Sequence, residues 1–82
     1  MYHVYILTSE KDPSKIYVGI SGNIDKRILE HNQRKSAYTK KYAPWKIETF
    51  ISFNDEHLAR YFERYLKSGS GFAFVKRHLL PK

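Results

Sequence analysis

Two tyrosines near the start of the chain could bring two phenols to one reactive site. Tyr5 lies in Val4-Tyr5-Ile6 and Tyr17 in Ile16-Tyr17-Val18-Gly19-Ile20, and both segments alternate as short β-strands do. If residues 9–15 close an antiparallel hairpin, with Asp12-Pro13-Ser14 as its turn, both phenols lie on the same face. Phenols donate and accept hydrogen bonds, and Gly19 leaves room beside Tyr17 for another backbone or a ligand.

An arginine and a histidine one helical turn apart follow the hairpin. We predict a helix over residues 24–33 that begins at Asn23, a residue type favoured at the N-cap, and that buries a ridge of isoleucines. Arg27 and His31 then lie on the adjacent ridge, so both border the core. The alternative is structural, with Arg27 paired to Glu30 and His31 placed at the helix C-terminus, where a cation is favourable.

The stretch over residues 33–44 has no helical or strand period, but it interleaves cations with aromatic and hydroxyl side chains. Cations contact phosphates, and aromatic rings stack on unpaired bases for about 1–3 kcal/mol per base. We predict that this stretch is a nucleic-acid surface formed by Arg34, Lys35, Tyr38, Lys40 and Lys41. The alternative is a solvated basic loop whose tyrosines pack on the core.

The composition limits the class of protein and the kind of partner. A chain of 82 residues fits one domain, residues 1–82, and fifteen Lys and Arg against eight Asp and Glu give a net charge of +7. This charge favours a polyanionic partner such as nucleic acid. The absence of cysteine excludes disulfides and thiolate metal sites, and no apolar run approaches the roughly 18 residues of a membrane span. We therefore expect a soluble, cytoplasmic protein without a membrane partner.

The rest of the chain completes a small α/β (α+β) fold. Residues 45–53 alternate as a third strand, and Asn54 is the expected N-cap of a helix that continues through residue 67. A last helix capped by Ser70 follows. We predict a three-stranded antiparallel sheet flanked by about three helices. The apolar stripe expected to face the core on the helix after Asn54 consists of Leu58, Tyr61, Phe62, Tyr65 and Leu66.

The ordered set of these residues resembles the GIY-YIG endonuclease superfamily. Its two signature tripeptides match Val4-Tyr5-Ile6, which lacks the Gly, and Tyr17-Val18-Gly19, and they are followed by Arg27 and then by His31-Asn32. A glutamate of the superfamily matches Glu63. The resemblance covers almost the whole chain. The chain looks most like the small standalone bacterial members of the superfamily, which are similar to the GIY-YIG incision domain of the ABC excinuclease.

The resemblance implies hydrolysis of phosphodiester bonds in DNA, with RNA left open, on branched or other structured substrates in repair or recombination. It implies that Tyr17 accepts a proton from the attacking water, that Tyr5 orients water or phosphate and that Arg27 binds the scissile phosphate. His31 would hydrogen-bond a tyrosine or relay a proton, and Glu63 would hold one Mg²⁺ or Mn²⁺. Because a tyrosine in water has a pKa near ~10, the alternative in which the cation activates the water and Tyr17 only positions it stays open.

Two features depart from the pattern of the superfamily. Related nucleases often carry an Asn late in the domain, whereas residues 68–82 contain none, and Phe72 stands where close relatives tend to have a basic residue. The main alternative function is therefore a non-catalytic nucleic-acid-binding module on the same fold, and an adaptor for acidic proteins is a third interpretation. The alternative for Glu63 is a surface pair with Lys67.

Overall fold

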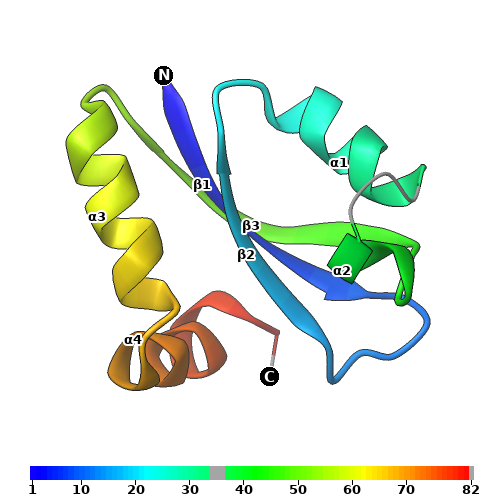
Figure 1. Ribbon diagram of the computed structural model, residues 1–82. Helices are drawn as coiled ribbons and strands as arrows, with labels where there is room; N and C mark the ends of the chain where they lie inside the picture. Colours follow the sequence, from blue (N-terminus) through cyan, green and yellow to red (C-terminus); the bar gives the residue numbers. More distant parts are fainter. Residues whose placement is uncertain (34–36, 82) are drawn as a thin grey trace.

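Three antiparallel strands form the centre of the computed structural model. The structure describes residues 1–33 and 37–81, and for residues 37 and 38 it describes the backbone alone. The strands are β1 (Tyr2–Ser9), β2 (Ile16–Ser21) and β3 (Trp45–Phe53), and they lie in the order β2-β1-β3 (Figure 1). Every residue of the central strand β1 from Val4 to its last residue, Ser9, is buried, as expected for a strand covered on both faces. The predicted three-stranded antiparallel sheet is confirmed.

The connection between β1 and β2 is the turn that the sequence predicts. The Asp12 carboxylate accepts hydrogen bonds from the backbone N–H of Ser14 at 3.1 Å and from its hydroxyl at 2.7 Å. This turn sets a register in which Tyr5 lies opposite Gly19. Tyr17 is two residues from Gly19 along β2, so both phenols lie on the same face, as predicted.

Helix α1 (Ile24–Asn32) covers this face and begins at the predicted cap, because the side chain of Asn23 accepts a hydrogen bond from Lys26 N–H at 3.1 Å. The other end of α1 is tied to β3 by a side-chain amide. Asn32 accepts from Trp45 N–H at 2.6 Å and donates to the Trp45 carbonyl at 3.1 Å. These bonds fix the position of α1 relative to the sheet.

A short helix, α2 (Ala37–Lys40), lies in the stretch in which the sequence shows no helical period. The prediction missed it because one turn is too short to show a period. Its position is fixed from outside the helix, since Trp45 Nε1 donates a hydrogen bond to the Thr39 carbonyl at 2.8 Å.

Helix α3 (Glu56–Leu66) follows β3 and differs from the prediction at its start. The N-cap is Asp55 rather than Asn54, because the Asp55 side chain accepts hydrogen bonds from two N–H groups of the first turn. The prediction chose the first capping residue type of the pair, whereas the backbone uses the second.

The buried face of α3 is also rotated from the predicted stripe. Ala59 and Leu66 are fully buried, whereas Leu58, Tyr61 and Tyr65 are 53%, 67% and 38% exposed. The small side chain of Ala59 lets the helix backbone approach the sheet, and this approach turns the neighbouring ridge of larger residues towards solvent. The predicted core position of these three residues is therefore wrong.

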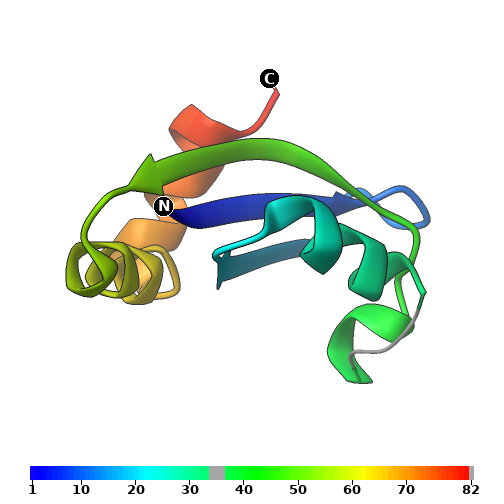
Figure 2. The same ribbon diagram turned by 90° about the horizontal axis from the view of Figure 1, so that it is seen from above.

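The chain ends in helix α4 (Gly69–Phe74) and a π-helical turn, η1 (Val75–Leu79). The N-cap of α4 is Ser68, which accepts from Gly71 N–H at 3.2 Å, and not the predicted Ser70. Gly71 packs so closely on α3 that a Cβ there would collide with the Tyr65 carbonyl. Helix α1 and η1 pack on opposite faces of the sheet, since their apolar residues belong to different clusters. Figure 2 looks onto the sheet, with α1 in front of it.

None of the helices in the described part of the chain has the length and apolar character needed to cross a membrane.

Candidate active site

A chain of hydrogen bonds runs through the buried part of the site. The Tyr5 phenol lies 3.2 Å from His31 Nε2, and His31 Nδ1 lies 2.7 Å from Thr39 Oγ1. All three side chains are buried. Arg27 donates a hydrogen bond to the Tyr5 oxygen, so we assign the phenol proton to the bond with His31 and the imidazole proton to the bond with Thr39. The hydrogen bond expected between His31 and a tyrosine is present.

Gly19 makes room for one of the phenols. A Cβ built on Gly19 would collide with the hydroxyl and the adjoining ring carbon of Tyr5 and would lie 2.9 Å from the ring of Tyr17. The sequence led us to expect space for another backbone or a ligand at this position. The space is instead occupied by the Tyr5 side chain, which reaches across from β1.

Tyr17 lies at the border between the buried chain of hydrogen bonds and solvent. Its ring centroid is 4.8 Å from that of His31 and 6.3 Å from that of Tyr5. Tyr17 is half-buried, and with Lys67 and Phe72 it lines a hollow of about 290 Å³. Of the two phenols, Tyr17 is therefore the one that a bound molecule could contact.

Arg27 forms the ion pair of the structural alternative and also lies at the buried phenol. Its guanidinium forms an ion pair with Glu30 at 3.1 Å and also hydrogen-bonds the Tyr5 phenol. The side chain remains 37% exposed, and a guanidinium has five N–H donors. Arg27 can therefore hold Tyr5 and Glu30 and still present donors to a phosphate.

Glu63 lies on α3, far along the chain from the two phenols. The rotation of α3 leaves its side chain only 14% exposed, and its charge acts on the Tyr5 phenol. Glu63 Oε2 pairs with Lys67 Nζ at 2.6 Å, so the structural alternative for this glutamate is also realised. Because Lys67 lines the hollow beside Tyr17, this ion pair lies at the edge of the phenol site.

The environment of the site keeps the buried groups neutral at physiological pH. Burial raises the pKa of the Tyr5 phenol to about 12, and the neighbouring Tyr17 adds to the effect, while Arg27 opposes it. Burial, followed by the charge of Arg27, lowers the pKa of His31 below its usual value. Tyr5 is thus a hydrogen-bond donor at neutral pH, and it cannot supply a phenolate there.

The predicted nucleic-acid surface can be described only in part. Arg34, Lys35 and the side chain of Tyr38 lie outside the described residues. Lys40 and Lys41 are exposed, and Lys41 Nζ lies 5.5 Å from the ring centroid of Tyr42.

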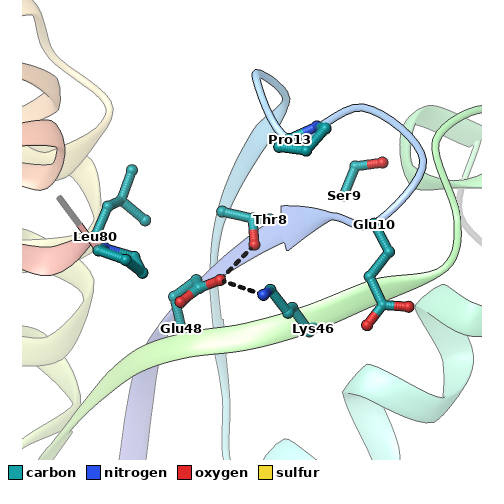
Figure 3. A pocket seen from close by; sticks show the side chains of 8 residues that line it. Thr8, Ser9, Glu10, Pro13, Lys46, Glu48 and Leu80 are labelled. Atoms are coloured by element: carbon teal, nitrogen blue, oxygen red, sulfur yellow. Dashed lines mark hydrogen bonds and ion pairs between the residues drawn. The ribbon is translucent and has the colours of Figure 1, made fainter.

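A second hollow, of about 420 Å³, lies away from the phenols, between the C-terminal segment and the loop after β1 (Figure 3). Glu48 accepts a hydrogen bond from the Thr8 hydroxyl at 2.7 Å and pairs with Lys46 at 3.3 Å. The predicted catalytic residues do not line this hollow, so it is not part of the phenol site.

The site offers one carboxylate to a cation. Over the described residues, no three His, Cys, Asp or Glu side chains are grouped so that they could hold a metal ion. A Mg²⁺ ion keeps several waters and takes phosphate oxygens as ligands, so a single carboxylate at Glu63 fits this ion.

The prediction of the site missed two contacts. The contact of Thr39 with His31 could not be predicted, because no sequence period links a residue of the short helix α2 to α1. Lys67 was considered only as a surface partner of Glu63, although it also lines the hollow beside Tyr17. The spacing of Lys67 after Glu63 was the available signal.

Comparison with known proteins identifies the family to which this small sheet and its helices belong. The family model of the GIY-YIG catalytic domain matches residues 1–75. UPF0213 protein CPE1444 from Clostridium perfringens (strain 13 / Type A) is 40% identical over 68 residues, which cover 82% of this chain and 71% of that protein. The chain belongs to the GIY-YIG family, so the resemblance noted in the sequence is confirmed. Membership implies nuclease-type activity and a nucleic-acid substrate.

Proposed function

We propose that this protein is a metal-dependent endonuclease that hydrolyses phosphodiester bonds in DNA, acting on single-stranded or branched substrates in cytoplasmic repair or recombination. The observation that supports the proposal is that Tyr17 from β2 and Arg27 from α1 lie beside the buried Tyr5 phenol, while Lys67 of the Glu63–Lys67 pair on α3 lines the hollow that Tyr17 borders. These elements are far apart in the chain. A purely structural role for each residue would not require them to meet.

The two phenols have different roles in the proposed reaction. Attack by water forms one P–O bond and breaks another, and the water gives up a proton. Tyr17, which lines the hollow, accepts this proton. Tyr5 stays protonated, is held by His31 and keeps Arg27 oriented towards the phosphate. The departing oxygen takes a proton from solvent.

Glu63 is the residue that would hold Mg²⁺ or Mn²⁺. When bound, such an ion neutralises charge on phosphate oxygens and lowers the pKa of coordinated water. Lys67 pairs with the Glu63 carboxylate at 2.6 Å, so a cation held by Glu63 would have to displace this ammonium. Arg27 contributes a fixed positive charge from α1.

The proposal is tested by nicking of single-stranded and branched DNA, and of RNA, by the purified chain with Mg²⁺ or Mn²⁺. Glu63→Gln should reduce the rate of nicking at least a hundredfold and leave DNA affinity in EDTA nearly unchanged. The substitution removes the charged carboxylate that would hold the cation but preserves the shape of the side chain. Glu56→Gln is the matched control, since Glu56 lies on the same helix and pairs only with the exposed Arg60. Nicking that survives Glu63→Gln as well as it survives Glu56→Gln would contradict the assignment of the metal ligand.

The same assay separates the catalytic proposal from a non-catalytic binding module. The close Glu63–Lys67 pair and the missing late Asn are the observations that favour the binding module. Salt-sensitive DNA binding without cleavage under either metal would establish the binding module and overturn the endonuclease proposal.

A further inference from the structure

The C-terminal part of the chain contains Lys and Arg residues but no Asp or Glu. Residues 64–82 contain five of the fifteen Lys and Arg residues and none of the eight Asp and Glu residues. Over the described residues, the ion pairs engage Arg27, Lys46, Arg60 and Lys67, and none involves Arg77. The charge of this guanidinium is therefore not neutralised by a carboxylate of the described chain.

A hollow of about 210 Å³ lies where this charge is exposed, between α3, α4 and η1. We call it the C-terminal hollow. Its walls carry a guanidinium, an imidazole, a hydroxyl and a phenol, all of which can donate hydrogen bonds to phosphate oxygens. The residues that line it are Tyr65, Ser70, Ala73, Phe74, Arg77 and His78.

Contacts between tilted aromatic rings hold the wall of this hollow in place. The ring centroid of Tyr65 is 6.2 Å from that of Phe62 and 6.4 Å from that of Phe74, and the Phe74 centroid is 5.0 Å from that of His78. Tyr65 nevertheless remains 38% exposed. A ring that is held by neighbours and still reaches solvent can stack on an unpaired base at little entropic cost.

The C-terminal hollow is connected to the phenol site through α4. Phe72 lines the hollow beside Tyr17, and Lys76 Nζ lies 5.1 Å from the centroid of the Phe72 ring. Arg77, the next residue after Lys76, lines the C-terminal hollow. Two cations that are adjacent in the chain thus lie at the two hollows: Lys76 against Phe72 of the hollow beside Tyr17, and Arg77 in the wall of the C-terminal hollow.

We propose that the C-terminal hollow binds a single-stranded segment of the nucleic-acid substrate, with a backbone phosphate at Arg77 and a base stacked on Tyr65. The proposal rests on the proposed function for the identity of the ligand. It adds a second contact point, away from the scissile phosphate, that sets the path of the strand.

The test measures binding of a fluorescein-labelled oligothymidylate by anisotropy in EDTA, over a range of salt concentrations, so that no cleavage occurs. Arg77→Gln should weaken binding about threefold to tenfold and reduce the slope of log affinity against log salt by about 0.7, the value for one single-strand phosphate contact. Lys11→Gln is the control, because it removes the same charge from an exposed position in the loop between β1 and β2. It should leave the slope unchanged.

An oligonucleotide with abasic positions separates the two contacts. Tyr65→Leu should weaken binding of oligothymidylate about fivefold or more and leave binding of the abasic strand unchanged, because only the former offers a base to stack. Arg77→Gln should weaken both. Thermal unfolding of each variant confirms that the fold is retained.

The outcomes distinguish this proposal from the proposed function. If the unmodified chain binds and cuts DNA while Arg77→Gln has the salt slope of Lys11→Gln, the C-terminal hollow is not a phosphate site and the endonuclease proposal stands. If the unmodified chain binds no nucleic acid at all, both proposals are overturned.

Discussion

The two phenols of the site illustrate how environment gives identical residue types different chemistry. Tyr5 is buried, bonded to His31 and Arg27, and has its pKa raised to about 12 by burial, so it remains a donor. Tyr17 is half-buried and lines a hollow. Alternation along the strands could predict that both phenols share a face, but it could not predict which one is buried. Which phenol is buried depends on Gly19, which lies opposite Tyr5 in the sheet and leaves space for the Tyr5 side chain.

Gly19→Ala tests this packing directly. The added methyl group collides with the Tyr5 phenol, which cannot move freely because it is buried and bonded to His31, so we expect a loss of about 1–3 kcal/mol in the free energy of unfolding. Urea unfolding measures the loss. Gly22→Ala is the control: a Cβ there would lie 4.0 Å from the nearest atom, and no Gly of the described chain has positive φ, so the change should stay within about 0.5 kcal/mol. Equal effects of the two substitutions would show that Tyr5 does not occupy this space.

At the scale of elements, helix α3 shows what sequence patterns can and cannot predict. The apolar period predicts a helix at this place, and its observed bounds differ by one residue at the N-cap. The period does not determine the rotation of the helix, because the apolar residues spread over two adjacent ridges and small Ala59, which is fully buried, lies beside the ridge of Phe62 and Leu66. The rotation matters for function, since it leaves Glu63 only 14% exposed next to Lys67 and leaves Tyr65 at the C-terminal hollow.

Paired substitutions on α3 distinguish the observed rotation from the predicted stripe. Ala59 is fully buried, so Ala59→Leu should overpack the interface with the sheet and cost about 1–3 kcal/mol of unfolding free energy. Leu58 is 53% exposed, so Leu58→Gln should change stability by no more than about 0.5 kcal/mol. Urea unfolding of both variants provides the measurement. The predicted stripe requires the reverse order of effects, and that result would contradict the rotation.

At the scale of the whole molecule, the sheet separates two apolar clusters. Tyr5, Tyr17 and the isoleucines of α1 belong to one cluster, while Val4 and Leu66 belong to the other. Glu63 therefore comes from a helix whose apolar side packs in the other cluster, and its partner Lys67 lines the hollow beside Tyr17. Local patterns could predict each element and the charge of the chain, but the meeting of these groups depends on how both layers are placed on one sheet (Figure 2).

His31 should make the stability of the whole molecule depend on pH in the mildly acidic range. Its pKa in the folded chain is lowered by burial and by Arg27, whereas an unfolded chain has the ordinary value near ~6.5. Above that value both states are neutral and His31 has no effect. As the pH falls below ~6.5, His31 becomes protonated in the unfolded state but stays neutral in the folded state. The free energy of unfolding therefore decreases, by at most about 1.4 kcal/mol per pH unit. Urea unfolding at several pH values between neutrality and the carboxylate range measures this slope.

A variant without this imidazole isolates its contribution to the pH profile. His31→Gln removes the titration and retains the other three histidines, so the variant should be less stable at neutral pH but should lose less stability on acidification. Parallel pH profiles for the two proteins would mean that His31 takes up its proton equally well in both states. That behaviour is incompatible with its burial between Tyr5 and Thr39, where the imidazole already has a hydrogen-bond partner at each ring nitrogen and the neighbouring Arg27 guanidinium repels a second positive charge.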